Sequence, residues 1–302
     1  MKRFIAASML MLAALTGHGA PDWPIPSEMK TVDVGGYPLA YVEAGTGVPF
    51  LIVHGAWVDH RLFAAQVAEF SKAFRVIAVS LRHHWPEPWD GKAGDYTVEQ
   101  HAADLVALVQ RLDLGKVHVL GHSRGGGVAA AMGRRAPEVV RSLILAEPSG
   151  MAEVAADPTV VRQRMAAGNA MTKQLKTGWE SGTPREQLAA RAWEAGNGAG
   201  SWERMPPPIR QMIADNIVTM TAPMIGSDPP IATCEQVGAW RMPVMLVQSS
   251  RPAPFFADIL DGLRRCNSAI APAVVVPDST HNMHLGNPAF FNRVVLDFAR
   301  AN

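Results

Sequence analysis

Residues 116–135 read KVHVLGHSRGGGVAAAMGRR and combine the signals of a buried strand, a sharp turn and a helix. The apolar run at 117–120 predicts the strand, and the alanine-rich stretch after Gly125 predicts the helix. Ser123 stands at the corner, where Gly121 and Gly125 relieve crowding, so its hydroxyl is expected to be an exposed nucleophile. The alternative is a serine that only caps the helix.

The segments on either side of this motif alternate between short apolar runs and helical patterns. Apolar runs predict strands at 48–55, 74–81, 140–148, 242–249 and 272–277, after a hairpin at 29–45. Helical spacing is found at 59–73, 97–112, 255–266 and 288–300. This alternation predicts an α/β fold with a mostly parallel sheet and crossover helices.

The alternation stops after Gly150 and resumes at about residue 238. Residues 151–237 contain alanine-rich helical pieces with scattered tryptophans and methionines. We therefore expect a helical cap at 151–237, inserted after the sixth strand of a sheet domain formed by 20–150 and 238–302. The Trp and Met side chains either line an apolar substrate cavity or form the core of the cap itself.

The first 19 residues, MKRFIAASMLMLAALTGHG, contain two basic residues, an apolar run and then small residues. This pattern is typical of a secretory signal peptide and is too short to span a bilayer as a helix. It predicts an exported protein, periplasmic or secreted, without membrane attachment once residues 1–19 are removed.

Cys234 and Cys266 are the only two cysteines. An oxidising compartment would allow them to form a disulfide, and two buried free thiols are the alternative. Their spacing fits neither a metal site nor a redox motif, so no metal is expected there.

Composition limits the class of partner. The chain is 48% hydrophobic and 18% charged, with a formal net charge of +1 and no Lys/Arg-rich block. It therefore lacks the electrostatic signature of proteins that bind nucleic acid or an anionic membrane surface. A small uncharged substrate fits better than a polyanion.

A serine hydroxyl needs a base within hydrogen-bond reach. His281 is preferred because it lies in the loop after the last predicted strand, and such loops share a sheet edge with Ser123. His284 is the alternative, although packing against the final helix suits it better. His122 adjoins the serine without facing it, and we assign it to the substrate pocket.

Acyl transfer also requires donors for the negative charge that develops on the carbonyl oxygen. The expected donors are the backbone N–H groups of Arg124, directly after the nucleophile, and of Ala56, after the strand at 48–55. Trp57 would then form a wall of the pocket. Arg251 and Arg124 could meet a substrate carboxylate or form surface salt bridges.

The segments VHGAWVDHRLF, LGHSRGG, RSLILAEP and THNMHLGNPAFFNRVVLDF resemble the α/β-hydrolase superfamily in order and spacing, across nearly the whole chain after residue 19. The resemblance implies an eight-stranded, mostly parallel sheet, a Ser–acid–His triad and no cofactor. It makes Ser123 the nucleophile and His281 the base.

The acid departs from the commonest pattern of that superfamily. Members usually carry an aspartate after the strand at 242–249, where this chain reads QSSRPAPFF. The family's other known location is the end of the strand after the nucleophile helix, and Glu147 stands there. Glu147 is therefore the preferred acid, with Asp258 as the alternative acid and a purely structural role as the alternative for Glu147. A carboxylate at this position resembles some lactone-cleaving members.

We therefore expect a serine hydrolase that cleaves a carboxylic ester or a lactone with an apolar portion through an acyl-enzyme. The same triad could instead cleave a C–C bond or an amide or form peracids, and a non-catalytic ligand-binding member of the fold is also an alternative. The oligomeric state stays open, a homodimer included.

Overall fold

The computed structural model describes residues 29–87, 89–92, 94–222 and 230–302, so the predicted signal peptide at 1–19 lies outside the described residues. One eight-stranded sheet has the strand order β1-β2-β4-β3-β5-β6-β7-β8. Strand β2 pairs antiparallel with β1 and β4, and every other pairing is parallel. The predicted α/β class and the eight-stranded, mostly parallel sheet are confirmed.

The strands are β1 Lys30–Asp33, β2 Pro38–Ala44, β3 Pro49–Val53, β4 Arg75–Val79, β5 Val117–His122, β6 Val140–Ala146, β7 Val244–Ser249 and β8 Val274–Val276. The α-helices are α1 Ala64–Phe70, α2 Val98–Arg111, α3 Arg124–Arg135, α4 Pro158–Glu180, α5 Arg185–Asn197, α6 Pro207–Asn216, α7 Cys234–Gly238, α8 Pro254–Cys266, α9 Met283–Gly286 and α10 Pro288–Ala301. Short 3-10 helices are η2 His60–Phe63, η3 Pro137–Val139 and η4 Ile217–Thr221.

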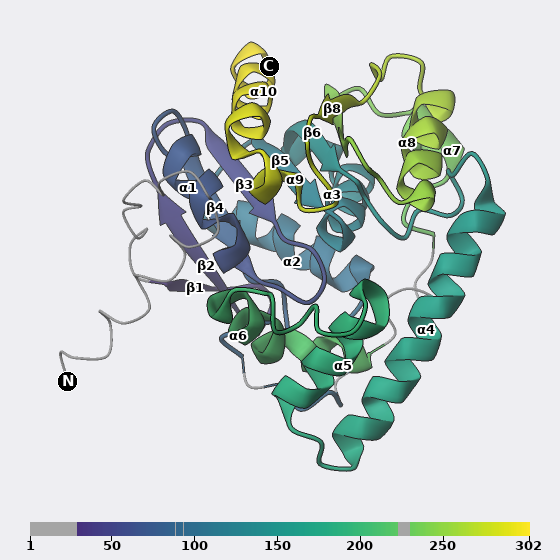
Figure 1. Cartoon of the computed structure of the whole chain (residues 1–302). Coiled ribbons are helices and arrows are strands. Elements are labelled where there is room, and N and C mark those ends of the chain that lie inside the picture. The colour runs from purple at the N-terminus through teal and green to yellow at the C-terminus, as the bar shows by residue number, and fades with distance from the viewer. Residues whose placement is uncertain (1–28, 88, 93, 223–229) are drawn as a thin grey trace.

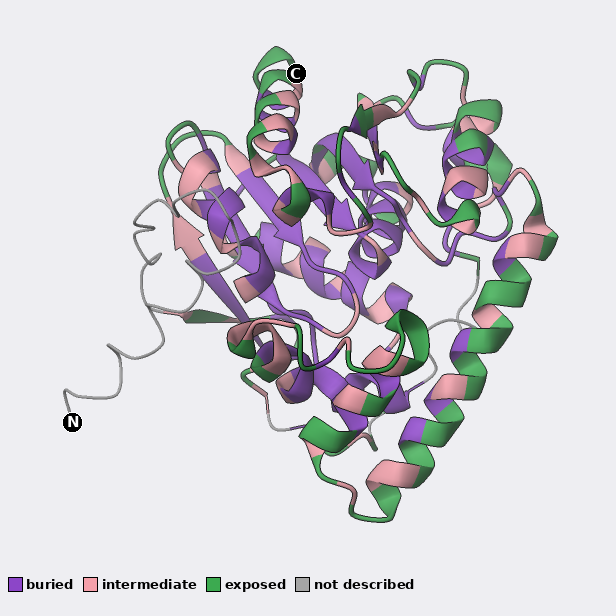
Figure 2. Cartoon of the chain, viewed as in Figure 1, coloured by how far each residue is buried: buried purple, intermediate pink, exposed green. Residues whose placement is uncertain are grey.

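The central strands are buried on both faces, as their continuous apolar runs predict. In β3, Leu51 and Val53 belong to one apolar cluster, whereas Phe50 and Ile52 belong to another. Successive side chains of a strand point to opposite faces, so each run supplies two cores. Helices α2, α3 and α8 contribute to the first cluster and α1 and α10 to the second, and Figure 2 shows the resulting buried sheet.

The helical cap follows β6, the sixth strand, as predicted. Figure 1 shows α5 and α6 side by side below the sheet, with the long α4 along one side of the molecule. Met212 and Ile213 of α6 are buried in the same apolar cluster as the sheet residues Phe50 and Ile52. The cap is thus packed onto the sheet domain through shared apolar surface, although its limits at 151–237 remain a prediction.

A disulfide joins Cys234, the first residue of α7, to Cys266, the last residue of α8, with a Cα–Cα distance of 4.9 Å. The disulfide therefore links α7, which lies just before β7 in the chain, to α8, which follows β7. In the described part of the chain, no helix has the length and apolar character needed to cross a bilayer.

Reduction of this disulfide should destabilise the protein. The two cysteines are 32 residues apart, and a loop of that size stabilises a fold by about 3 to 4 kcal/mol in the chain-entropy account. We expect the free energy of unfolding in denaturant to fall by that amount in Cys266→Ser, and reductant to have no further effect on this variant. Equal stability of the variant and the unreduced protein would contradict the pairing.

Candidate active site

Ser123 occupies a strained turn between β5 and α3. Its backbone has a φ of +55°, a left-handed conformation that bulky residues avoid and that costs on the order of 1 to 3 kcal/mol. Four hydrogen bonds hold the turn: the Ser123 N–H donates to the Ala146 carbonyl at 3.0 Å, and the Ser123 carbonyl accepts from the N–H groups of Gly126 at 2.9 Å, Gly127 at 3.4 Å and Ser149 at 3.0 Å.

Two glycines make this turn sterically feasible. A Cβ on Gly125 would collide with the backbone carbonyls of Val53 and His54 at the end of β3, and a Cβ on Gly121 would collide with the backbone of Gly125. Strand β3, strand β5 and helix α3 therefore approach closely only because these positions lack side chains.

Glu147 and His281 form the closest acid–base contact near this turn. The His281 Nδ1 and Glu147 Oε2 atoms are 2.6 Å apart, although the residues are 134 positions apart in the chain. Glu147 directly follows β6, has a φ of +42° and is fully buried. Because the ionised carboxylate only accepts hydrogen bonds, His281 donates from Nδ1 and its Nε2 is left to accept a proton.

Ser249, the last residue of β7, completes the surroundings of the Glu147 carboxylate. Its backbone N–H and its hydroxyl donate to Glu147 Oε1 at 2.8 and 2.6 Å. Burial alone would raise the pKa of Glu147, but the hydrogen bonds from His281 and Ser249 outweigh it and hold the pKa below its ordinary value of 4.5. The carboxylate is therefore ionised at neutral pH.

The loop that carries His281 is fixed from three sides. His122 donates from Nε2 to the His281 carbonyl at 2.8 Å, which ties the loop to the residue before Ser123. Ser250 and Ser279 exchange hydrogen bonds between their backbone and hydroxyl groups across the β7 and β8 loops. The Phe256 ring stacks on the His281 ring, with centroids 4.3 Å apart and planes at 13°.

The loop at 55–58, which follows β3 and His54, lies against the turn at Ser123, since a Cβ on Gly55 would contact the Ser123 Cβ. His54 is buried, accepts from the Leu81 N–H at 3.0 Å and donates from Nδ1 to the Gly55 carbonyl at 2.7 Å. Burial lowers the pKa of His54 to about 4, so the ring is neutral. Its contacts assign it to holding this loop, which contains Ala56 and Trp57.

A sequence profile described as the alpha/beta hydrolase family matches residues 50–294. The chain belongs to the alpha/beta hydrolase family. This match confirms the resemblance to the α/β-hydrolase superfamily.

Among related sequences, an uncharacterised protein of Mycobacterium tuberculosis is 32% identical over 126 residues, 42% of this chain. The match spans only 36% of the length of that relative. A 2-(acetamidomethylene)succinate hydrolase of Mesorhizobium japonicum is 24% identical over 281 residues, 90% of this chain and 95% of that protein. The crystal structure of carboxylesterase CesB from Bacillus subtilis covers 93% of this chain and 94% of its own, with a TM-score of 0.71 and 19% identity. This last likeness concerns the fold alone.

Among the described residues, Asp258, Arg251 and His284 take no part in the polar contacts of the Glu147–His281 pair, whereas His122 bonds the His281 carbonyl. Asp258 lies within α8, and in the described residues no hydrogen bond or ion pair joins its side chain to His281. Arg251 is exposed in the loop after β7. His284 is buried; it stacks on Phe63 of η2, with centroids 4.3 Å apart, and its ring centroid lies 6.0 Å from that of Phe291 in the final helix.

The Arg124 side chain does not form the surface salt bridge that the sequence left open. It is only 3% exposed, its Nη1 contacts His101 Nδ1 at 2.7 Å, and its guanidinium lies over the Tyr96 ring. Its backbone begins α3, where the first N–H groups have no partner within the helix. That position suits the predicted role of its N–H as a donor.

Several residues of the site were not predicted from the sequence. Ser249, Phe256 and His101 contact Glu147, His281 and Arg124, respectively. No local pattern marks these three residues, because each contact joins segments that are separate in the chain. Across residues 29–87, 89–92, 94–222 and 230–302, no three His, Cys, Asp or Glu side chains are grouped so that they could hold a metal ion.

Acid should destabilise the protein partly through Glu147. Because its folded-state pKa is lowered, the ionised carboxylate stabilises the fold above its ordinary value of 4.5, and this stabilisation is lost as the pH falls below it. We expect the free energy of unfolding to decrease less steeply between about pH 5 and pH 3 in Glu147→Gln, which cannot titrate, than in the unmodified protein. Denaturant titrations at several pH values would measure the slope of the unfolding free energy against pH for each protein, with Asp258→Asn as the control. Identical slopes for Glu147→Gln and the unmodified protein would contradict the prediction.

Proposed function

We propose that the protein is a serine hydrolase that cleaves a carboxylic ester or a lactone with an apolar portion. Ser123 is the nucleophile, His281 the base and Glu147 the acid. The observation that carries the proposal is the 2.6 Å contact between His281 Nδ1 and Glu147 Oε2, tied by His122 to the strained turn at Ser123. A nucleophile, a base and an orienting carboxylate together form the arrangement that acyl transfer needs.

The reaction follows from the roles of these groups. Ser123 Oγ attacks the carbonyl carbon while His281 Nε2 accepts the hydroxyl proton, and Glu147 stabilises the imidazolium. The backbone N–H groups of Ala56 and Arg124 donate to the developing oxyanion. His281 then returns its proton to the leaving oxygen, and water, activated by the same base, hydrolyses the acyl-enzyme.

The preference for an apolar portion is based on the side chains between the sheet and the cap. Trp57, Met171, Trp179 and Met205 are partly buried against the apolar cluster that the cap and the sheet share. Such side chains provide contact area and adaptable packing for an apolar acyl or alcohol group. Trp202 and Met212 are buried and serve the core of the cap instead.

We also propose that the protein is exported after removal of residues 1–19. The disulfide between Cys234 and Cys266 supports an oxidising compartment, because disulfides rarely persist in the cytosol. Mass spectrometry of the mature protein from the periplasm or medium would identify its first residue.

Fluorophosphonate labelling tests the nucleophile. A fluorophosphonate should modify the purified protein once, at Ser123, because only a serine activated by a neighbouring base reacts readily. Intact mass and peptide mapping would measure this, and Ser123→Ala should remain unlabelled while Ser142→Ala, which removes a buried hydroxyl bonded to His118, should label as before. A folded protein that stays unlabelled at Ser123 would favour a non-catalytic ligand-binding role.

The identity of the acid is tested by paired substitutions. Glu147→Gln should lower kcat for a p-nitrophenyl ester by roughly 100-fold or more, because the amide no longer fixes the His281 tautomer or stabilises the imidazolium. Asp258→Asn should leave kcat within about twofold, since no hydrogen bond or ion pair among the described residues joins its side chain to His281. The reverse pattern would assign the acid to Asp258.

A further inference from the structure

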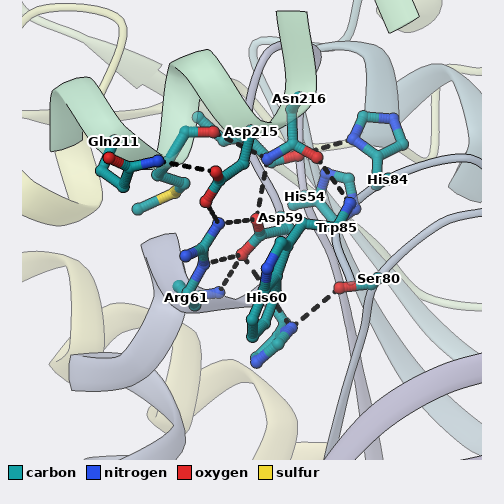
Figure 3. A network of polar contacts seen from close by, with 12 residues as sticks. His54, Asp59, His60, Arg61, Ser80, His84, Trp85, Gln211, Asp215 and Asn216 are labelled. Carbon is teal, nitrogen blue, oxygen red and sulfur yellow. Dashed lines mark hydrogen bonds and ion pairs between the residues drawn. The ribbon is translucent and has the colours of Figure 1, made fainter. Parts of the chain in front are cut away.

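We infer that Asn216, at the end of cap helix α6, is a positioning residue that holds the oxyanion loop at 55–58 in its working conformation. The inference rests on the proposed function, because it assigns the Ala56 N–H to the oxyanion. Its physical basis is a buried hydrogen-bond network that joins the cap to the residue after this loop, shown in Figure 3.

Asp59, directly after the loop, is the centre of this network. The Asn216 side-chain amide donates to Asp59 Oδ2 at 2.7 Å, although the residues are 157 positions apart. Both side chains are buried, with exposures of 0% for Asp59 and 1% for Asn216. The other end of the same amide, Asn216 Oδ1, accepts from the Trp85 backbone N–H at 2.8 Å.

Arg61 adds a second connection between the same elements. Its guanidinium donates to both oxygens of Asp59, at 2.9 and 2.7 Å, and also to Asp215 Oδ2 at 2.8 Å. The Arg61 guanidinium also lies over the Trp85 ring, 4.0 Å from its centroid. Two adjacent residues of the cap, Asp215 and Asn216, thus fix the start of η2. Asp59, the N-cap of η2, directly follows the oxyanion loop.

The loop needs such support because its backbone is strained. Trp57 has a φ of +74°, a left-handed conformation that costs on the order of 1 to 3 kcal/mol and persists only where the surroundings enforce it. His54 fixes the Gly55 carbonyl at one end of the loop, and His84 donates to the Val58 carbonyl at 2.8 Å. Asp59 anchors the far end, and Asn216 is the cap residue that binds it directly.

Loss of the Asn216 amide would release this end of the loop. Asp59 would keep only Arg61 as a side-chain donor, and the Trp85 N–H would lose its acceptor. An unsatisfied buried donor costs about 1 to 3 kcal/mol, so the segment would rearrange to find new partners. Because Trp57 relaxes toward an unstrained conformation, the Ala56 N–H would turn away from the oxyanion.

The test is Asn216→Ala in the purified protein, compared with Gln211→Ala. Gln211 lies on the same helix and donates to Asp215 Oδ1 at 2.8 Å, but it does not touch the loop. For a short p-nitrophenyl ester, Asn216→Ala should lower kcat about tenfold or more with KM nearly unchanged, because the oxyanion interaction forms only in the transition state. Affinity for a boronic acid that mimics the tetrahedral intermediate should fall by the same factor.

Hydrogen exchange measured by mass spectrometry provides a readout independent of turnover. Peptides that cover 54–61 should exchange faster in Asn216→Ala than in Gln211→Ala, while peptides from β5 remain unchanged. If Asn216→Ala does not fold, Asn216→Ser leaves a small neutral polar group in the buried site, but its single hydroxyl cannot replace the amide that serves Asp59, the Met212 carbonyl and the Trp85 N–H together, and the same changes are expected. Unchanged kcat and unchanged exchange in a folded variant would overturn the inference.

The outcomes also separate this inference from the proposed function. Faster loop exchange in a protein whose Ser123 is never labelled would support the anchoring and reject the serine hydrolase. Normal labelling of the unmodified protein, with full activity in Asn216→Ala, would reject the positioning role and leave the proposed function intact.

Discussion

The sharp backbone turn at Ser123 is the constraint on which the other features of the site depend. The turn requires a left-handed residue between β5 and α3 and a close approach of β3, which leaves no room for side chains at Gly121 and Gly125. Since β3, β5, β6, β7 and β8 run parallel, the loops that follow them meet at one edge of the sheet. Each further group of the site is delivered by one of these loops.

Strain gathers at this edge rather than being spread over the fold. Trp57, Ser123 and Glu147 follow three neighbouring strands, and all three have positive φ. Each is held by hydrogen bonds from other elements. Ser123 donates to the backbone of β6, and Glu147 forms hydrogen bonds with the backbone of β7 and the Ser249 hydroxyl. The loop of Trp57 is anchored through Asp59 by Asn216 of the cap. Backbone strain of this kind persists only where a rigid scaffold enforces it.

The arrangement of the sheet could be predicted from sequence because it depends on local patterns. Apolar runs such as PFLIV at 49–53 define buried strands, and Thr97 caps α2 as its residue type indicates. Glu147 could be selected as a candidate because it ends a predicted strand. The role of Ser249 could not, since its value comes from hydrogen bonds to a carboxylate 102 residues away. The positive φ of Trp57 had no signal either, because no glycine or asparagine marks it.

The order of the site along the chain has a consequence for how such proteins diverge. Ser123 and Glu147 both precede the cap, and His281 alone follows it. With Glu147 as the proposed acid, two of the three proposed catalytic groups lie before the cap, whereas an acid after β7 would put two of the three beyond it. Under the proposed roles, changes in the length and sequence of the cap leave Ser123 and Glu147 in place, as long as a side-chain amide still reaches Asp59.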